Sequence, residues 1–221
     1  MKETLNRTLK DSGASPRPNI ARALLALACV AAAFAAALAQ SQTASKTGDS
    51  RMTASAAVKV AAPAPKVGER APDFRLPYAT QAAIFMKPEE QMTLASQRGK
   101  NVILAFYPAD WSGGCTKEVC TFRDTFAELS KLNANVLGVS GDYVFSHQEW
   151  AKHHNLQFPL LSDHDHAVAK MYDSYMEQYG MNKRTVYLID KDGVVRYVNL
   201  AFKAGDKKDY DALRAELEKL K

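Results

Sequence analysis

Two cysteines, Cys115 and Cys120, lie shortly after an all-apolar run, Val102 to Phe106. Such a run is typical of a buried strand. A short segment containing one Pro and two Gly follows it, and apolar residues then recur at helical spacing, at Val119, Phe122, Phe126 and Leu129. This order predicts a strand, a turn and a helix, with Cys115 in the first turn of the helix.

The predicted position of Cys115 favours an anion. The first turn of a helix has unpaired backbone N–H groups and the positive end of the helix dipole. A free thiol, with a pKa near 8.5, is only a few per cent thiolate at neutral pH, and the thiolate is the nucleophile. A helix N-terminus raises the thiolate fraction. The sequence therefore predicts a reactive sulfur.

A structural disulfide between Cys115 and Cys120 is the alternative. Two residues five apart on a regular helix are about 8.6 Å apart between Cα atoms, whereas a disulfide usually needs less than about 6.8 Å. A bond between these cysteines requires the helix to unwind locally. The spacing therefore favours a bond that forms and breaks in a cycle over a permanent one.

The first 39 residues have a composition of their own. Five Lys or Arg and two Asp or Glu come first, and an uncharged stretch, Ala23 to Ala39, ends in Ala37-Leu38-Ala39. This pattern predicts a secretory signal peptide over residues 1–39, with Cys29 inside it. The stretch approaches the roughly 18 residues of a spanning helix, so an uncleaved membrane anchor is the alternative.

The rest of the chain divides into a tether and one domain. Residues 40–66 are rich in Ala, Ser, Thr and Pro, which predicts a flexible tether. Residues 67–221, about 155 in number, suit a single domain. Lys and Arg number 29 against 24 Asp and Glu, but 24 and 22 remain after residue 39, a net charge of +2. This balance does not suggest nucleic-acid binding.

Strand and helix patterns alternate along the domain. Further strands are predicted at Val136 to Val139, Phe158 to Leu161, Thr185 to Ile189 and Val194 to Val198. Further helices are predicted from a capping box at Ser146-His147-Gln148-Glu149 to His154-Asn155, over Ala167 to Tyr175, and from Asp206 or Asp209 to the end. Asp190-Lys191-Asp192-Gly193 is typical of a hairpin turn.

These elements predict an α/β sandwich with a mixed central sheet flanked by helices. Reactive groups collect at the carboxyl ends of parallel strands in such sheets, and the turn from Pro108 to Cys115 follows one of these ends. A hairpin strand running antiparallel begins at the same edge, and Arg184 precedes it. We therefore expect Arg184 near Cys115.

Pro108, Ser112 and Cys115 follow the pattern P-x-x-x-(T/S)-x-x-C. This pattern resembles the peroxidatic signature of the peroxiredoxins, the AhpC/TSA family. The segment from Cys115 to Asp124 is similar to the bacterioferritin comigratory protein, or Q-type, branch, and so are three further segments: Val67 to Phe74, Phe158 to Asp163 and Arg184 to Asp190. The resemblance covers about residues 67–200 and implies a thioredoxin-like fold.

The resemblance implies roles for six residues. Cys115 is the peroxidatic thiolate, which a peroxide oxidises to a sulfenic acid, and Cys120 is the resolving thiol of the same chain. Arg184 stabilises the thiolate and the leaving oxygen, and the Ser112 hydroxyl binds the thiolate or the peroxide. The remaining two are Pro108, which shields the pocket from water, and Glu118, which orients an arginine. An exposed helical glutamate is the alternative for Glu118.

The chain departs from the family pattern in three places. Ser112 replaces the commoner Thr, and Gly113 replaces the Pro that is usual in the Q-type branch, so we expect a looser loop. Residues 79–92 are longer than the usual first hairpin.

The reaction implied by the resemblance needs no metal or bound cofactor. Its partners are a peroxide and a thioredoxin-like dithiol reductant, and a monomer or weak dimer is expected. Five histidines could suggest a metal site, particularly at Asp163-His164-Asp165-His166, but their spacing supports none.

The sequence thus predicts a periplasmic or otherwise exported thiol peroxidase that reduces hydrogen peroxide and organic hydroperoxides. Two alternatives remain. One is a thioredoxin-like thiol–disulfide oxidoreductase, for which a C-x-x-C spacing would be expected. The other is a non-enzymatic exported redox sensor that signals by unwinding around Cys115.

Overall fold

The computed structural model describes residues 64–220. The predicted leader and all of the predicted tether except residues 64–66 lie outside the described residues. Within the described part, the central sheet has seven strands in the order β11-β10-β5-β6-β7-β2-β3. They are β2 (Tyr78–Ala79), β3 (Ile84–Phe85), β5 (Asn101–Phe106), β6 (Ala134–Ser140), β7 (Leu160–Ser162), β10 (Thr185–Ile189) and β11 (Val195–Asn199).

The sheet is mixed, as predicted. β5, β6 and β7 are parallel, whereas β10 runs antiparallel to β5 and β2 runs antiparallel to β7. Two short antiparallel pairs lie outside this sheet: β1 (Arg75–Leu76) with β4 (Met92–Thr93), and β8 (Tyr175–Met176) with β9 (Met181–Asn182). The β10–β11 hairpin is confirmed, and Gly193 in its turn has a positive φ of 79°.

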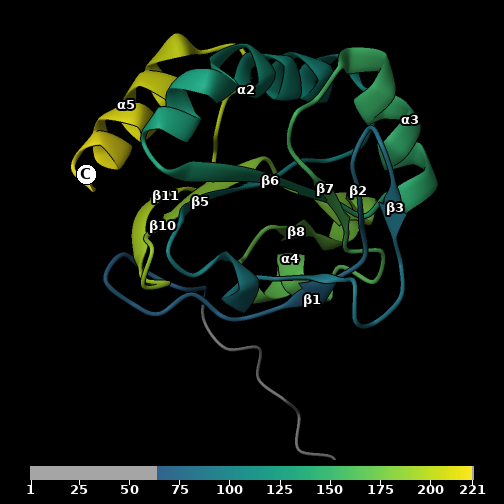
Figure 1. Ribbon diagram of the computed structural model, residues 1–221, viewed down its shortest axis with the longest axis horizontal. Helices are drawn as coiled ribbons and strands as arrows, with labels where there is room; N and C mark the ends of the chain where they lie inside the picture. Colours follow the sequence, from purple (N-terminus) through teal and green to yellow (C-terminus); the bar gives the residue numbers. More distant parts are fainter. Residues whose placement is uncertain (1–63, 221) are drawn as a thin grey trace, which may run out of the picture. The chain divides into compact units, whose positions relative to one another are not determined.

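Helices cover both faces of the sheet (Figure 1). The α-helices α2 (Gly113–Lys131), α3 (Val144–His154) and α5 (Lys207–Glu218) lie on one face, and α4 (Ala167–Met171) lies on the other. Two short 3-10 helices complete the set, η1 (Ala95–Gln97) and η2 (Glu177–Tyr179). This arrangement confirms the predicted sandwich.

A hydrophobic core lies on each face of the sheet, and β5 contributes side chains to both cores. Ile103 and Ala105 pack with α2, α3 and α5, whereas Val102, Leu104 and Phe106 pack with α4 on the opposite face. All six residues of β5 are buried, which explains why the strand reads as a continuous apolar run. The strand that leads into the cysteine segment is thus fixed from both sides.

Three predicted boundaries are wrong. α3 begins at Val144 with Tyr143 as N-cap and no side-chain cap, so the capping box at Ser146 does not exist. The helix predicted to reach Tyr175 ends at Met171, because Asp173 adopts a positive φ of 47°. β7 begins at Leu160, since Pro159 has no N–H for the ladder.

Two further predictions are confirmed, the cap of α5 and the end of α3. Asp206 caps α5 by accepting from the Lys208 N–H at 3.0 Å. α3 ends at His154, followed by Asn155 in the left-handed region. The long segment 79–92 includes β3, which pairs with β2 at the sheet edge.

Among residues 64–220, no helix has the length and apolarity to cross a membrane.

Candidate active site

Cys115 lies in the first turn of α2, as predicted. The chain leaves β5 at Phe106, crosses the turn from Tyr107 to Ser112 and enters α2 at Gly113, with Ser112 as N-cap. Cys115 is the third residue of the helix and its side chain is fully buried. Cys115 therefore lies in the turn whose backbone N–H groups have no partner within the helix.

Arg184 reaches Cys115 from the neighbouring strand. Thr185, the first residue of β10, pairs with Phe106, the last residue of β5, so Arg184 lies at the edge where the cysteine turn begins. Its Nη2 donates to Cys115 Sγ at 3.4 Å. The contact expected from the hairpin is therefore present, and it places a fixed positive charge on the sulfur.

Gly114 lets the guanidinium approach the helix. A Cβ at this position would lie 3.2 Å from Arg184 Nη2, whereas a Cβ at Gly113 would meet nothing within 4 Å. The two glycines of the turn are therefore not equivalent, since only Gly114 borders the arginine.

Glu118 holds Arg184 from the next turn of α2. Its Oε2 forms an ion pair with Arg184 Nη1, and the side chain is only 1% exposed. The exposed-glutamate alternative is therefore wrong. Burial raises the pKa of Glu118 to about 7, against the opposing effect of Arg184. Burial also disfavours charge on Arg184, but Glu118 and Cys115 outweigh it and raise the pKa of the guanidinium.

Ser112 and Pro108 lie in the same turn. The Ser112 hydroxyl donates to the Ala109 carbonyl oxygen at 3.1 Å, which closes the turn before the helix. Pro108 is half-buried. Both side chains therefore border the Cys115 segment, and their roles toward a peroxide stay predictions.

Cys120 lies on a different face of α2. It is partly buried, and its Sγ is 3.8 Å from Nδ1 of His154, the last residue of α3. Both cysteines are free thiols, and α2 is continuous through both of them. Two positions five apart on a helix differ by about 140° in direction. The helix thus keeps the two sulfurs apart.

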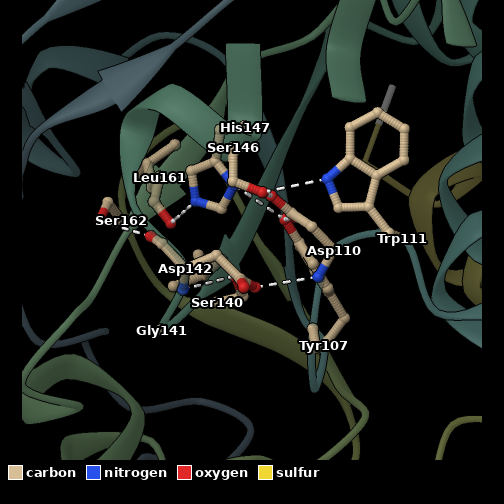
Figure 2. Close-up of polar contacts among 12 residues, drawn as sticks. Tyr107, Asp110, Trp111, Ser140, Gly141, Asp142, Ser146, His147, Leu161 and Ser162 are labelled. Atoms are coloured by element: carbon tan, nitrogen blue, oxygen red, sulfur yellow. Dashed lines mark hydrogen bonds and ion pairs between the residues drawn. The ribbon is translucent and has the colours of Figure 1, made fainter. Parts of the chain in front are cut away.

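A buried polar network ties the cysteine turn to the rest of the fold (Figure 2). Asp110 is its centre: Oδ1 accepts from Tyr107 at 2.8 Å, and Oδ2 accepts from Ser146 at 2.7 Å and lies 2.9 Å from His147 Nδ1. The Asp110 N–H donates to Asp142 Oδ2 at 2.9 Å. The turn is therefore bonded to the start of α3 and to the loop after β6.

The contacts of His147 show which ring nitrogen carries a hydrogen. Nε2 lies 3.2 Å from the Leu161 carbonyl oxygen, which can only accept, so Nε2 carries a hydrogen. The His147 and Asp110 side chains are both at most 1% exposed. Tyr107 remains a phenol that donates to Asp110, since burial and the Asp110 charge raise its pKa well above the usual value.

Trp111 joins this network from the surface. Its backbone has a positive φ of 60°, which is uncommon for an aromatic residue. Its indole N–H donates to Ser146 Oγ at 3.2 Å, and its ring packs 5.6 Å from the ring of His153 and 6.5 Å from that of His154. The cysteine turn and the end of α3 are therefore in contact.

Asp110, Trp111 and His147 were not predicted from the sequence to be site residues. The signal for His147 was available: Val144, His147 and Trp150 recur at a spacing of three and form the buried face of α3. A polar residue on such a face requires a hydrogen-bond partner. The partner itself, Asp110, comes from a turn that has no periodic pattern.

The remaining histidines make separate contacts. His164 Nε2 lies 2.7 Å from the Tyr143 hydroxyl, and His166 Nδ1 lies 2.8 Å from Asn182 Oδ1. Among residues 64–220, no three His, Cys, Asp or Glu side chains are grouped as a metal site would require.

Comparisons with known proteins identify relatives. The model of the AhpC/TSA family matches residues 67–198. A Coxiella burnetii protein named as a peroxiredoxin, bcp, is 41% identical over 139 residues, which are 60% of this chain and 87% of that protein. The chloroplastic peroxiredoxin Q of Triticum aestivum is 43% identical over 108 residues, 48% of this chain and 50% of that protein.

A solved structure agrees with these relatives. The peroxidoxin BcpB of Mycobacterium tuberculosis superimposes with a TM-score of 0.61 at 30% identity, over 71% of this chain and 99% of that one. The matched region contains the whole cysteine turn and the hairpin that carries Arg184.

Proposed function

Since the chain belongs to the AhpC/TSA family, in its Q-type branch of thiol peroxidases, we propose that it is an exported enzyme that works through a Cys115 sulfenic acid resolved by Cys120. The observation that carries this proposal is the contact of Arg184 Nη2 with Cys115 Sγ. A buried sulfur in the first turn of a helix with a guanidinium on it is arranged to be an anionic nucleophile.

In the first step, the Cys115 thiolate attacks one oxygen of the peroxide. An S–O bond forms, the O–O bond breaks, and the second oxygen leaves as hydroxide or alkoxide and takes a proton to give water or an alcohol. The sulfur loses two electrons and becomes a sulfenic acid. Arg184 stabilises the negative charge on the sulfur and on the leaving oxygen. Ser112 binds the peroxide and Pro108 keeps water out.

In the second step, the Cys120 sulfur attacks the sulfenic sulfur of Cys115. An S–S bond forms, the S–O bond breaks and water leaves. Since α2 keeps the two sulfurs on different faces, its first turn must unwind before the disulfide can form. The intrachain disulfide is then reduced by a thioredoxin-like dithiol.

The proposed substrates are hydrogen peroxide and organic hydroperoxides. The proposed location is the periplasm or another exported compartment, supported by the composition of residues 1–39. In an oxidising compartment, reduction of the disulfide requires electrons delivered by a dithiol partner. The proposed partner is therefore an exported thioredoxin-like dithiol protein.

The test measures peroxide consumption by the full chain, carrying Cys29→Ser, with a dithiol reductant. We expect Cys115→Ser to lose activity, and Cys120→Ser to react once and then accumulate sulfenic and sulfinic acid in place of an intrachain disulfide. Intact mass after one and after several equivalents of peroxide, without the reductant, distinguishes these products, since the sulfinic acid consumes a second peroxide. Peroxide consumption by Cys115→Ser at the wild-type rate would overturn the proposal. An intrachain disulfide in Cys120→Ser would remove Cys120 from the mechanism.

A further inference from the structure

The side chain next to Cys120 is a histidine, His154, which has no role in the mechanism proposed above. His154 Nδ1 lies 3.8 Å from Cys120 Sγ, across the contact between α2 and α3. This distance suits a hydrogen bond that involves sulfur. His154 is the last residue of α3, whereas Cys120 lies in the second turn of α2. The contact therefore depends on the packing of the two helices.

We propose that His154 is a catalytic base for the resolving step, which accepts the proton of the Cys120 thiol before that sulfur attacks the Cys115 sulfenic acid. This inference rests on the proposed function, because it assigns a role within the second half of that cycle. The structure supplies three supports: the position of the imidazole, its protonation state and the charges around it.

Two aromatic rings pack against the imidazole of His154, and a hydrogen bond fixes the backbone of this residue. The Trp150 ring packs against it edge-on at 5.9 Å, and the Trp111 ring lies 6.5 Å away. The backbone of His154 is fixed to α2, since Arg123 Nη1 donates to its carbonyl oxygen at 2.9 Å. Nδ1 is therefore directed at Cys120, and a packed ring loses little freedom when it takes up a proton.

The imidazole is neutral at neutral pH. Burial lowers the pKa of His154, and its neighbours His153 and Arg123 lower it further. A neutral ring with its hydrogen on Nε2 presents the Nδ1 lone pair to the thiol and can accept its proton.

The titratable groups that face His154 are few. Cys120 and Arg123 contact it from α2, and His153 is its neighbour on α3. The Arg123 guanidinium is also paired with Asp124 at 2.8 Å. The positive charge of Arg123 stabilises a thiolate formed beside it.

The step balances without a further reagent. His154 takes the proton from the Cys120 thiol, and the resulting thiolate gives two electrons to form the S–S bond. The S–O bond of the sulfenic acid breaks, and the departing hydroxide receives the proton as water. A thiol with the ordinary pKa of about 8.5 is only a few per cent thiolate at pH 7, so a base at this position speeds the attack.

The experiment separates the two half-reactions in single turnover. The full chain carries Cys29→Ser so that only two thiols remain, and it reacts with one equivalent of peroxide. Stopped-flow peroxide consumption reports the first step, and acid quench with intact mass reports disulfide formation. For His154→Gln we expect an unchanged first step and disulfide formation slower by roughly 10². His164→Gln, an exposed histidine that contacts Tyr143 and not His154 or Cys120, is the matched control and leaves both steps unchanged.

The pH profile adds a readout that a structural role would not change. In wild type, the rate of disulfide formation falls at acid pH as the imidazole is protonated and is level above it. In His154→Gln, the rate rises about tenfold per pH unit until the thiol itself ionises, and added imidazole partly restores it. Equal rates and equal profiles for wild type and His154→Gln would overturn the inference.

Failure of the inference and failure of the proposed function give different results. If the wild type forms no Cys120-dependent disulfide, both the proposed function and this inference are contradicted. If the disulfide forms but does not depend on His154, only this inference falls. If His154→Gln does not fold, the wild-type profile decides: a rate that rises steadily from pH 5 to 9 contradicts a base of lowered pKa.

Discussion

Arg184 contacts Cys115 across 69 residues of sequence, because the pairing of Thr185 with Phe106 brings the start of β10 to the end of β5. Glu118 holds the other side of the same guanidinium. The buried sulfur, the partly buried arginine and the buried glutamate thus form a triad whose geometry depends on one strand register and one turn of helix.

Replacing Arg184 should slow the reaction with peroxide. We expect Arg184→Met to lower the second-order rate constant by roughly 10² to 10³, because a fixed charge on the thiolate and the leaving oxygen is lost. Arg184→Lys should recover only part of the loss, since an ammonium cannot contact Cys115 and Glu118 together as the planar guanidinium does. Stopped-flow peroxide kinetics measure both, and a change smaller than about threefold in Arg184→Met would contradict the assigned role.

A methyl group at Gly114 should displace the arginine. The Cβ of Gly114→Ala would lie 3.2 Å from Arg184 Nη2, which pushes the guanidinium away from the sulfur by a few tenths of an ångström. We expect a roughly tenfold loss in the rate of reaction with peroxide. Gly113→Ala is the matched control, because its Cβ meets nothing within 4 Å. Equal effects of the two substitutions would point to the helix start and not to Arg184.

Glu118 should make stability depend on pH. Burial raises its pKa from 4.5 to about 7, so between these values the native state holds a proton that the unfolded state has released. The stability contributed by this proton is complete below pH 4.5 and is lost as pH rises to about 7.

Urea unfolding of wild type and Glu118→Gln at several pH values tests this sign. We expect the wild type to lose stability relative to Glu118→Gln between pH 5 and 7, by at most about 1.4 kcal/mol per pH unit for one proton. A difference that stays constant over this range would show that Glu118 is ionised throughout.

The buried pair of Asp110 and His147 should be strongly coupled. Removing one partner leaves the other buried without its main contact, so Asp110→Asn and His147→Gln should each cost about 3 kcal/mol or more in unfolding free energy. The double variant should cost less than the sum of the two. His164→Gln is the control, because this exposed histidine contacts Tyr143 outside the network. Additive effects would mean that the two side chains act independently.

The leader should be absent from the mature protein. Cleavage after Ala37-Leu38-Ala39 predicts an N-terminus at Gln40 in the exported fraction. N-terminal sequencing of the protein from its native host measures this. Full-length protein in the membrane fraction would instead support the anchor.

The sequence predicted the chemistry because the reactive group and its helix are local. The apolar run, the turn and the periodic residues after it place Cys115 in a first helical turn without any tertiary information. Arg184 could also be predicted, since a hairpin antiparallel to a central strand must begin at the edge where that strand ends. Boundaries were less reliable: Ser146 resembled a cap, but its hydroxyl bonds to Asp110 instead.

The tertiary structure alone decided which polar residues are paired. The spacing of Val144, His147 and Trp150 could indicate that His147 is buried, but nothing in the sequence shows that its partner is Asp110. Nor does it show that Cys120 meets His154, 34 residues away. These contacts depend on how α3 packs against α2 and the cysteine turn, and helix packing is set by the whole core. Local spacing identified the nucleophile, and packing selected the groups that control it.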